Sequence, residues 1–193
     1  MKRLLFAALF ICLFVFQAGQ AQTPGETYSD SPVLPAGMQG QRIQALIDTL
    51  NSGDQDKIRQ FLTTHCTEQF RSFVPMEEHI EVFLGLFQET GGVDFSGIRT
   101  YVPERKGQTV VIVKDRNYES YRGITLRFTD APEYLIGGAG LSPARPPADL
   151  KEEPLTQEQF LDETKAFMAK LIDKGMFSGT LLVLKRLLDA THG

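Results

Sequence analysis

The feature that most constrains the fold is a change of hydrophobic period at Gly91 and Gly92. Before these glycines, apolar residues recur at spacings of three, four and seven residues, which place them on one face of a helix. After them, β-branched runs and strict alternation follow, and both are typical of strands. Because the helices come first and the strands follow together, the pattern predicts an α+β fold with an antiparallel meander.

Three helices are predicted before the glycine pair. The first ends at Asn51-Ser52-Gly53, where a glycine suits the left-handed C-terminal cap. Asp54 is the predicted N-cap of the second helix, and Pro75 suits the first position of the third. A further short turn is expected over 70–74. The apolar faces consist of Ile43, Leu46, Ile47 and Leu50, then Ile58, Phe61 and Leu62, and then Ile80, Phe83, Leu84 and Phe87.

Four strands are predicted after the glycine pair, and they span 93–102, 109–113, 121–129 and 134–141. The third is the clearest, because its apolar and polar residues alternate strictly from Ile124 to Thr129. Glycines in the fourth strand predict a bulge or a sharp bend. The expected domain is therefore three N-terminal helices packed against a four-stranded antiparallel sheet.

Residues 1–21 are interpreted as a secretory signal peptide that is removed before Gln22. Lys2 and Arg3 give a basic start, an apolar run follows, and small residues precede the cleavage site. The apolar run is shorter than the roughly 20 residues that a membrane-spanning helix needs, so a retained anchor is the weaker alternative. We therefore expect an exported protein, periplasmic or secreted, without a stable membrane anchor.

The composition of the exported chain disfavours several classes of partner. The formal net charge is −4 at pH 7, and removal of the two basic leader residues makes it −6. An acidic exported protein is a poor candidate for binding nucleic acid or anionic lipid. Cys66 is then the only cysteine, so no internal disulfide is possible and the fold depends on its hydrophobic core.

Two predicted linkers divide the exported chain. Residues 22–35 are small and polar, and residues 143–155 contain prolines that stiffen the chain. The domain between them spans 36–142. After the second linker, a capping box predicts a helix over 156–174, and an apolar strand is predicted over 177–185. The capping box is formed by Thr156 and Gln159.

Three stretches resemble an N-terminal accessory region of exported serine hydrolases of the β-lactamase and penicillin-recognising superfamily. They are residues 43–54, which end in Asn-Ser-Gly-Asp, residues 138–141, Gly-Ala-Gly-Leu, and residues 145–150, Arg-Pro-Pro-Ala-Asp-Leu. The order of helices and strands is similar to the NTF2-like, or cystatin-like, cone fold. By this resemblance, residues 156–193 are the truncated start of a hydrolase domain, with its first helix and an orphan first strand.

The catalytic motifs of that superfamily are absent from this sequence. Its mechanism needs Ser-x-x-Lys, in which a lysine one helical turn from the serine activates the nucleophile. No serine here has a lysine three residues on, and Tyr-x-Asn is also missing. The resemblance therefore implies a non-catalytic accessory module whose partner is the missing hydrolase domain, with no catalytic, cofactor-binding or metal residues and no cofactor.

Two other functions remain open at this point. The first is a stand-alone NTF2-like module that binds a small molecule or forms a homodimer through its sheet or C-terminal helix. The second is a small NTF2-like enzyme with a polar dyad in its cone, and no Asp/His pair on the strands supports it. The sequence does not specify a substrate, a ligand or an oligomeric state.

Histidine and cysteine side chains are the first candidate site residues. His65 and Cys66 are adjacent, so on a helix their side chains point about 100° apart, which favours a surface histidine beside a partly buried cysteine over a nucleophile and its base. His65, His79 and Cys66 lack the spacing of metal ligands. The acidic residues near His79 are interpreted as a solvated helix face. They are Glu77, Glu78 and Glu81.

The remaining candidate is a pocket inside the cone. Polar or aromatic residues on the predicted strands are its candidate lining, namely Arg99, Tyr101, Tyr121 and Arg127. A buried arginine needs an ion pair or an anionic ligand, because an unpaired charge is costly in an apolar interior. The alternation does not identify the inward face, so the alternative is that these side chains lie on the outer side of the sheet.

Overall fold

The computed structural model describes residues 27–150 and 155–181 of the 193-residue chain. These residues belong to two compact units, which divide between residues 151 and 152. The second unit contains α5 (Gln157–Asp173). The predicted signal peptide, residues 1–21, lies outside the described residues. The first unit contains, in chain order, β1 (Thr27–Ser31), α1 (Met38–Leu50), α2 (Gln55–His65), α3 (Glu68–Arg71), α4 (Met76–Thr90), β2 (Val93–Val102), β3 (Thr109–Asp115), β4 (Tyr121–Phe128) and β5 (Ile136–Pro143).

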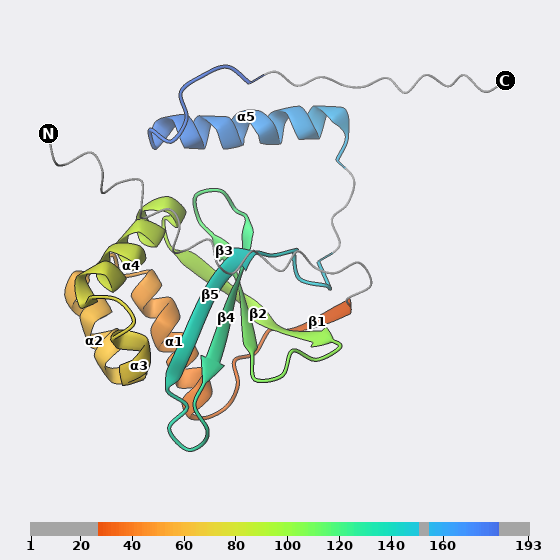
Figure 1. The fold of residues 1–193 in the computed structure, drawn as a ribbon. Coiled ribbons are helices and arrows are strands. Elements are labelled where there is room, and N and C mark those ends of the chain that lie inside the picture. Colours follow the sequence, from red (N-terminus) through yellow and green to blue (C-terminus); the bar gives the residue numbers. More distant parts are fainter. Residues whose placement is uncertain (1–26, 151–154, 182–193) are drawn as a thin grey trace, which may run out of the picture. The chain divides into compact units, whose positions relative to one another are not determined.

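The first unit is a five-stranded antiparallel sheet with α1 to α4 on one side of it (Figure 1). The strands lie in the order β1-β2-β3-β4-β5, so each one pairs with the next along the chain. The α+β class and the antiparallel meander are therefore confirmed. The expected number of four strands is wrong, because β1 adds a fifth strand at one edge.

β1 lies within residues 22–35, which the sequence analysis assigns to a linker. Its residues pair antiparallel with β2, so that Tyr28 lies opposite Tyr101 and Asp30 lies opposite Arg99. Its sequence has no alternation of apolar and polar residues from which a strand could be predicted. The strand is stabilised by hydrogen bonds to β2 and by contacts of the side chains on one face, and these partners are distant in sequence.

Capping residues set the helix ends close to the predicted positions. The Asp54 carboxylate accepts hydrogen bonds from the backbone N–H groups of Asp56 (2.8 Å) and Lys57 (3.1 Å), and so satisfies donors in the first turn of α2. Gly91 ends α4 with a φ of 66°, a left-handed conformation that glycine adopts without strain.

The main hydrophobic core lies between the helices and the sheet. β3 contributes Val111 and Val113, which have no exposed surface. Alternation along the strand turns Val110 and Ile112 to the opposite face, where they form a second, smaller cluster. The other buried members of the main cluster are Ile43, Leu46, Ile47, Leu50, Ile58, Phe61, Leu62, Cys66, Ile80, Val93, Ile124, Leu126 and Ile136.

The turn between β3 and β4 is built around a buried aspartate, Asp115. Its carboxylate accepts hydrogen bonds from Tyr118 N–H (2.6 Å), from the Ser120 hydroxyl and from Arg122 Nε (3.3 Å). Burial raises the pKa of this carboxyl, but the hydrogen bonds outweigh burial and hold the pKa below its ordinary value. Arg122 also pairs with Glu89 of α4 over 2.7 Å, which ties the turn to that helix.

In the second unit, α5 begins at the predicted capping box. Thr156 Oγ1 accepts from Gln159 N–H (3.2 Å), and the Gln159 side chain accepts from Thr156 N–H (2.9 Å). Residues 177–181 form no strand, contrary to the prediction. A strand needs hydrogen-bonded neighbours, and no described strand pairs with this segment. The rest of the predicted strand, 182–185, lies outside the described residues.

Candidate functional site

Three of the four candidate pocket residues gather on the face of the sheet that points away from the helices. Arg99 and Tyr101 are buried there, and Tyr121 packs against the smaller apolar cluster to which Tyr101 belongs. Arg127 lies on the same face of β4 by alternation, but it is exposed and separate. The structure therefore does not place these residues in a common pocket between sheet and helices.

The centre of this outer face is a buried ion pair between β1 and β2. Arg99 Nε lies 2.8 Å from Asp30 Oδ1, and Arg99 Nη2 lies 3.0 Å from Asp30 Oδ2. Their side chains are 0% and 4% exposed. The guanidinium also lies over the Tyr28 ring, 3.8 Å from its centroid. We call Tyr28, Asp30 and Arg99 the clamp.

The clamp holds a segment of the chain that leaves β5, residues 145–148, which we call the strap. Arg99 Nη2 donates to the carbonyl oxygens of Arg145 and Pro146, both at 3.0 Å. The Tyr28 hydroxyl donates to the same Pro146 oxygen over 3.1 Å. The start of the predicted linker 143–155 is therefore bound to the sheet.

The acidic half of the clamp binds the other end of the strap. Ala148 N–H donates to Asp30 Oδ2 over 2.9 Å. Every hydrogen bond that the clamp makes with the strap therefore goes to main-chain atoms. The residues preceding prolines favour extended conformations, and the prolines fix their own φ near −65°, so the strap has few alternative shapes.

The electrostatics of the clamp favour a permanently charged guanidinium. Burial lowers the pKa of Arg99, but the hydrogen bonds and charge of Asp30 outweigh burial and raise the pKa. One donor atom remains, because Arg99 Nη1 is buried and has no hydrogen-bond partner within the described ranges. The clamp therefore presents the Tyr28 hydroxyl and the Arg99 guanidinium as donors to carbonyl oxygens, and the Asp30 carboxylate as an acceptor for one N–H group.

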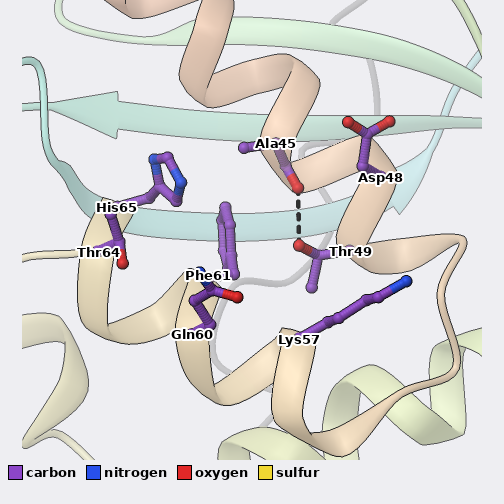
Figure 2. A pocket seen from close by; sticks show the side chains of 8 residues that line it. All are labelled: Ala45, Asp48, Thr49, Lys57, Gln60, Phe61, Thr64 and His65. Atoms are coloured by element: carbon purple, nitrogen blue, oxygen red, sulfur yellow. Dashed lines mark hydrogen bonds between the residues drawn. The ribbon is translucent and has the colours of Figure 1, made fainter.

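A second candidate lies on the helical side, in a groove of about 410 Å³ between α1 and α2. Figure 2 shows side chains of both helices along it. α1 contributes three small side chains, of Ala45, Asp48 and Thr49, whereas α2 contributes five residues, which include Phe61. The lining residues are Ala45, Asp48, Thr49, Lys57, Gln60, Phe61, Thr64 and His65.

His65 at one end of the groove is oriented by a buried arginine. Arg42 Nη1 lies 3.1 Å from His65 Nδ1, and because arginine only donates, Nδ1 accepts and Nε2 carries the proton. Burial, and then the charge of Arg42, lower the pKa of His65. The imidazole is therefore a neutral donor at neutral pH.

Cys66 and His79 take no part in either candidate site. Cys66 is a buried core residue, and burial raises the pKa of its thiol to about 12, so it is not a nucleophile at neutral pH. His79 stacks on Phe70 with a centroid distance of 5.3 Å. In the part of the chain that the structure describes, no three His, Cys, Asp or Glu side chains gather as metal ligands would.

Two parts of the site, Asp30 and the strap, are absent from the residues that the sequence predicts as a site. Asp30 lies 69 positions before Arg99, so no local pattern links them. One sequence signal could have located the strap, the pair Pro146-Pro147, which offers carbonyls without N–H groups. No local signal points to Asp30.

No helix within residues 27–150 and 155–181 has the length and hydropathy needed to cross a membrane. No family model matches the chain, and the searches of curated proteins and of solved structures give no match either.

Proposed function

We propose that residues 27–150 are a non-catalytic accessory module, of the NTF2-like cone type, that anchors the chain leading to a second domain. The observation that supports this most is the clamp. A buried ion pair and a tyrosine hydroxyl hold the main chain of residues 145–148. The start of the connection is thereby bound to the sheet instead of leaving it as a free linker.

The energetics favour a fixed connection. Hydrogen bonds to charged groups contribute about 1.5–3 kcal/mol each, and a segment stiffened by proline loses little conformational entropy on binding. A connection that needed only to be flexible would not require two buried charges, whose desolvation is costly. Positioning of the following unit is the function that this arrangement serves.

The class of the second domain comes from the sequence resemblance. We propose that it is an exported serine hydrolase domain of the β-lactamase and penicillin-recognising superfamily, and that the signal peptide directs export. The test is the DNA after the codon for Gly193. A reading frame that continues into a Ser-x-x-Lys region supports the proposal, and its absence contradicts the hydrolase assignment.

The anchoring role is tested separately by hydrogen exchange of the full chain. The Ala148 amide should be protected from exchange in the wild type. It should lose protection in Asp30→Asn, because this variant lacks the charged carboxylate to which the Ala148 N–H donates. Asp94→Asn is the matched control, because Asp94 pairs with Arg116 in an exposed position. An unprotected amide at Ala148 in the wild type would contradict the anchoring role.

A stand-alone ligand-binding module is the second candidate, and the α1–α2 groove favours it. Lys57 and Gln60 line the groove, and neither side chain has a hydrogen bond or ion pair to another described residue. His65 adds a neutral N–H donor. A thermal-shift screen with small carboxylates should then show stabilisation that Lys57→Ala removes and Lys106→Ala retains. Equal stabilisation of both variants would contradict a groove site.

A further inference from the structure

We propose that the clamp is a peptide-binding site for the main chain of a proline-rich segment. The strap fills this site in cis, and the same segment of a second copy of the chain can fill it in trans. This binding activity goes beyond the anchoring role and does not depend on the class of the second domain. It rests on the geometry of Tyr28, Asp30 and Arg99.

The order of hydrogen-bonding groups in the clamp matches a Pro-Pro segment. Two successive carbonyls, of Arg145 and Pro146, face donors of the clamp. Pro146 and Pro147 have no N–H group, so no main-chain donor of theirs competes with the guanidinium. The next N–H, of Ala148, meets the Asp30 carboxylate at 2.9 Å. An ordinary segment would place extra donors between these groups.

The clamp keeps hydrogen-bonding capacity for a bound segment, which favours replacement of one segment by another. Arg99 and Asp30 satisfy each other only in part, and hydrogen bonds from a segment to these charged groups are net favourable. When the strap leaves, Nη2 loses two acceptors and Oδ2 loses one donor. The strap also leaves Nη1 without a partner among the described residues, so it does not exhaust the donors of the clamp.

The segment that covers the clamp can be displaced from outside the molecule. Arg145 and Ala148 are exposed, and Pro146 and Pro147 are half-buried, so the segment lies on the surface of the sheet. A covalently connected segment competes at an effective concentration in the millimolar range. The wild-type chain should therefore bind an added segment weakly, and weakening the cis contact should expose the site.

The experiment uses the full chain and a fluorescent peptide with the sequence of residues 142–150. The key variant is Ala148→Pro, which deletes the N–H donated to Asp30. Ala148 is the second residue of a turn closed by Leu150 N–H and the Pro147 carbonyl at 3.1 Å, a position that favours proline. This substitution should therefore leave the turn intact, while the ring Cδ that replaces the bonded hydrogen removes the bond and keeps the segment from lying as close to Asp30.

Fluorescence anisotropy should show at least about tenfold tighter peptide binding to Ala148→Pro than to the wild type, because the lost bond involves a charged acceptor. Adding Tyr28→Phe, which deletes only the hydroxyl, should weaken binding about fivefold. Tyr118→Phe is the matched control and should change nothing. The peptide that carries the same Ala-to-Pro change should bind about tenfold more weakly than the unmodified peptide.

The proposal is overturned if Ala148→Pro, folded by circular dichroism, binds the peptide no more tightly than the wild type. It is also overturned if adding Tyr28→Phe to Ala148→Pro leaves the peptide affinity unchanged, or if adding Tyr118→Phe lowers that affinity equally. These outcomes are separate from the tests of the accessory module. An unprotected Ala148 amide in the wild type contradicts anchoring, whereas peptide titration of the variant reports on the clamp alone.

Discussion

Asp115→Asn should be among the most destabilising conservative substitutions in the β-sheet unit. The carboxylate is fully buried and accepts hydrogen bonds from Tyr118 N–H, the Ser120 hydroxyl and Arg122 Nε. The amide has nearly the same shape, so no cavity forms. Its NH₂ group, however, can accept nothing, and at least one donor loses its partner while the Arg122 charge remains.

The expected loss is about 3 kcal/mol of unfolding free energy, since breaking a buried charged pair typically costs this much. For a unit of this size, that corresponds to a fall in Tm of roughly 10 °C. The assay is urea unfolding followed by circular dichroism. Asp94→Asn makes the same chemical change in an exposed ion pair with Arg116 and should cost less than about 0.5 kcal/mol.

The pH dependence gives a second, independent readout. Because the folded pKa of Asp115 is lowered, its contribution is present above the unfolded pKa of about 4 and is lost as the pH falls through the folded pKa. The difference between wild type and Asp115→Asn should therefore shrink below about pH 4. A loss below 1 kcal/mol, or a difference that does not change with pH, would refute the reasoning.

Three further predictions concern separate parts of the first unit. Cys66 should react with iodoacetamide at pH 8 only slowly in the native chain and rapidly in urea, because burial raises its thiol pKa to about 12; equal rates would contradict a buried thiol. His65 should titrate by NMR below the usual pKa of about 6.5, because burial and Arg42 lower its pKa. Its contribution to stability is then present above that pH and lost as the pH falls towards the folded pKa, and a value at or above 6.5 would contradict this. Gly53→Ala should cost about 2–3 kcal/mol, because φ is +57° and the new Cβ would lie 2.6 Å from an α4 ring. Gly107→Ala has a similar φ in open space and should cost about 1 kcal/mol in the same urea titration; equal costs would contradict the steric reasoning.

The helices and the four strands β2 to β5 could be predicted from sequence because their signals are local. Asp54 caps the helix that it precedes, Gly91 ends the helix that it follows, and β4 shows its buried face through strict alternation. Such features need only neighbours within a few positions. The α+β class then follows from their order.

The candidate site could be predicted only in part, because its contacts join distant positions. The sequence predicts Arg99, Tyr101 and Tyr121 as polar or aromatic strand residues, but alternation leaves open which face they occupy. The choice is made by Asp30, which pairs with Arg99 across 69 positions, and by the strap, whose Pro146 lies 118 positions from Tyr28. Neither partner has a periodic pattern of its own.

The position of β1 has a consequence for the order in which the molecule assembles. Strands β2 to β5 pair with their sequence neighbours, so each pairing closes a short loop. The pairing of β1 with β2 closes a long loop, because Thr27 lies opposite Val102. Loop closure over such a distance is slow, and β1 leaves the ribosome long before its partner exists. The strap is bound in part by Tyr28 and Asp30, so its binding site is incomplete until β1 has paired with β2. We therefore expect β1 and the strap to join last, to open first, and to do so as one cooperative unit within an otherwise intact sheet.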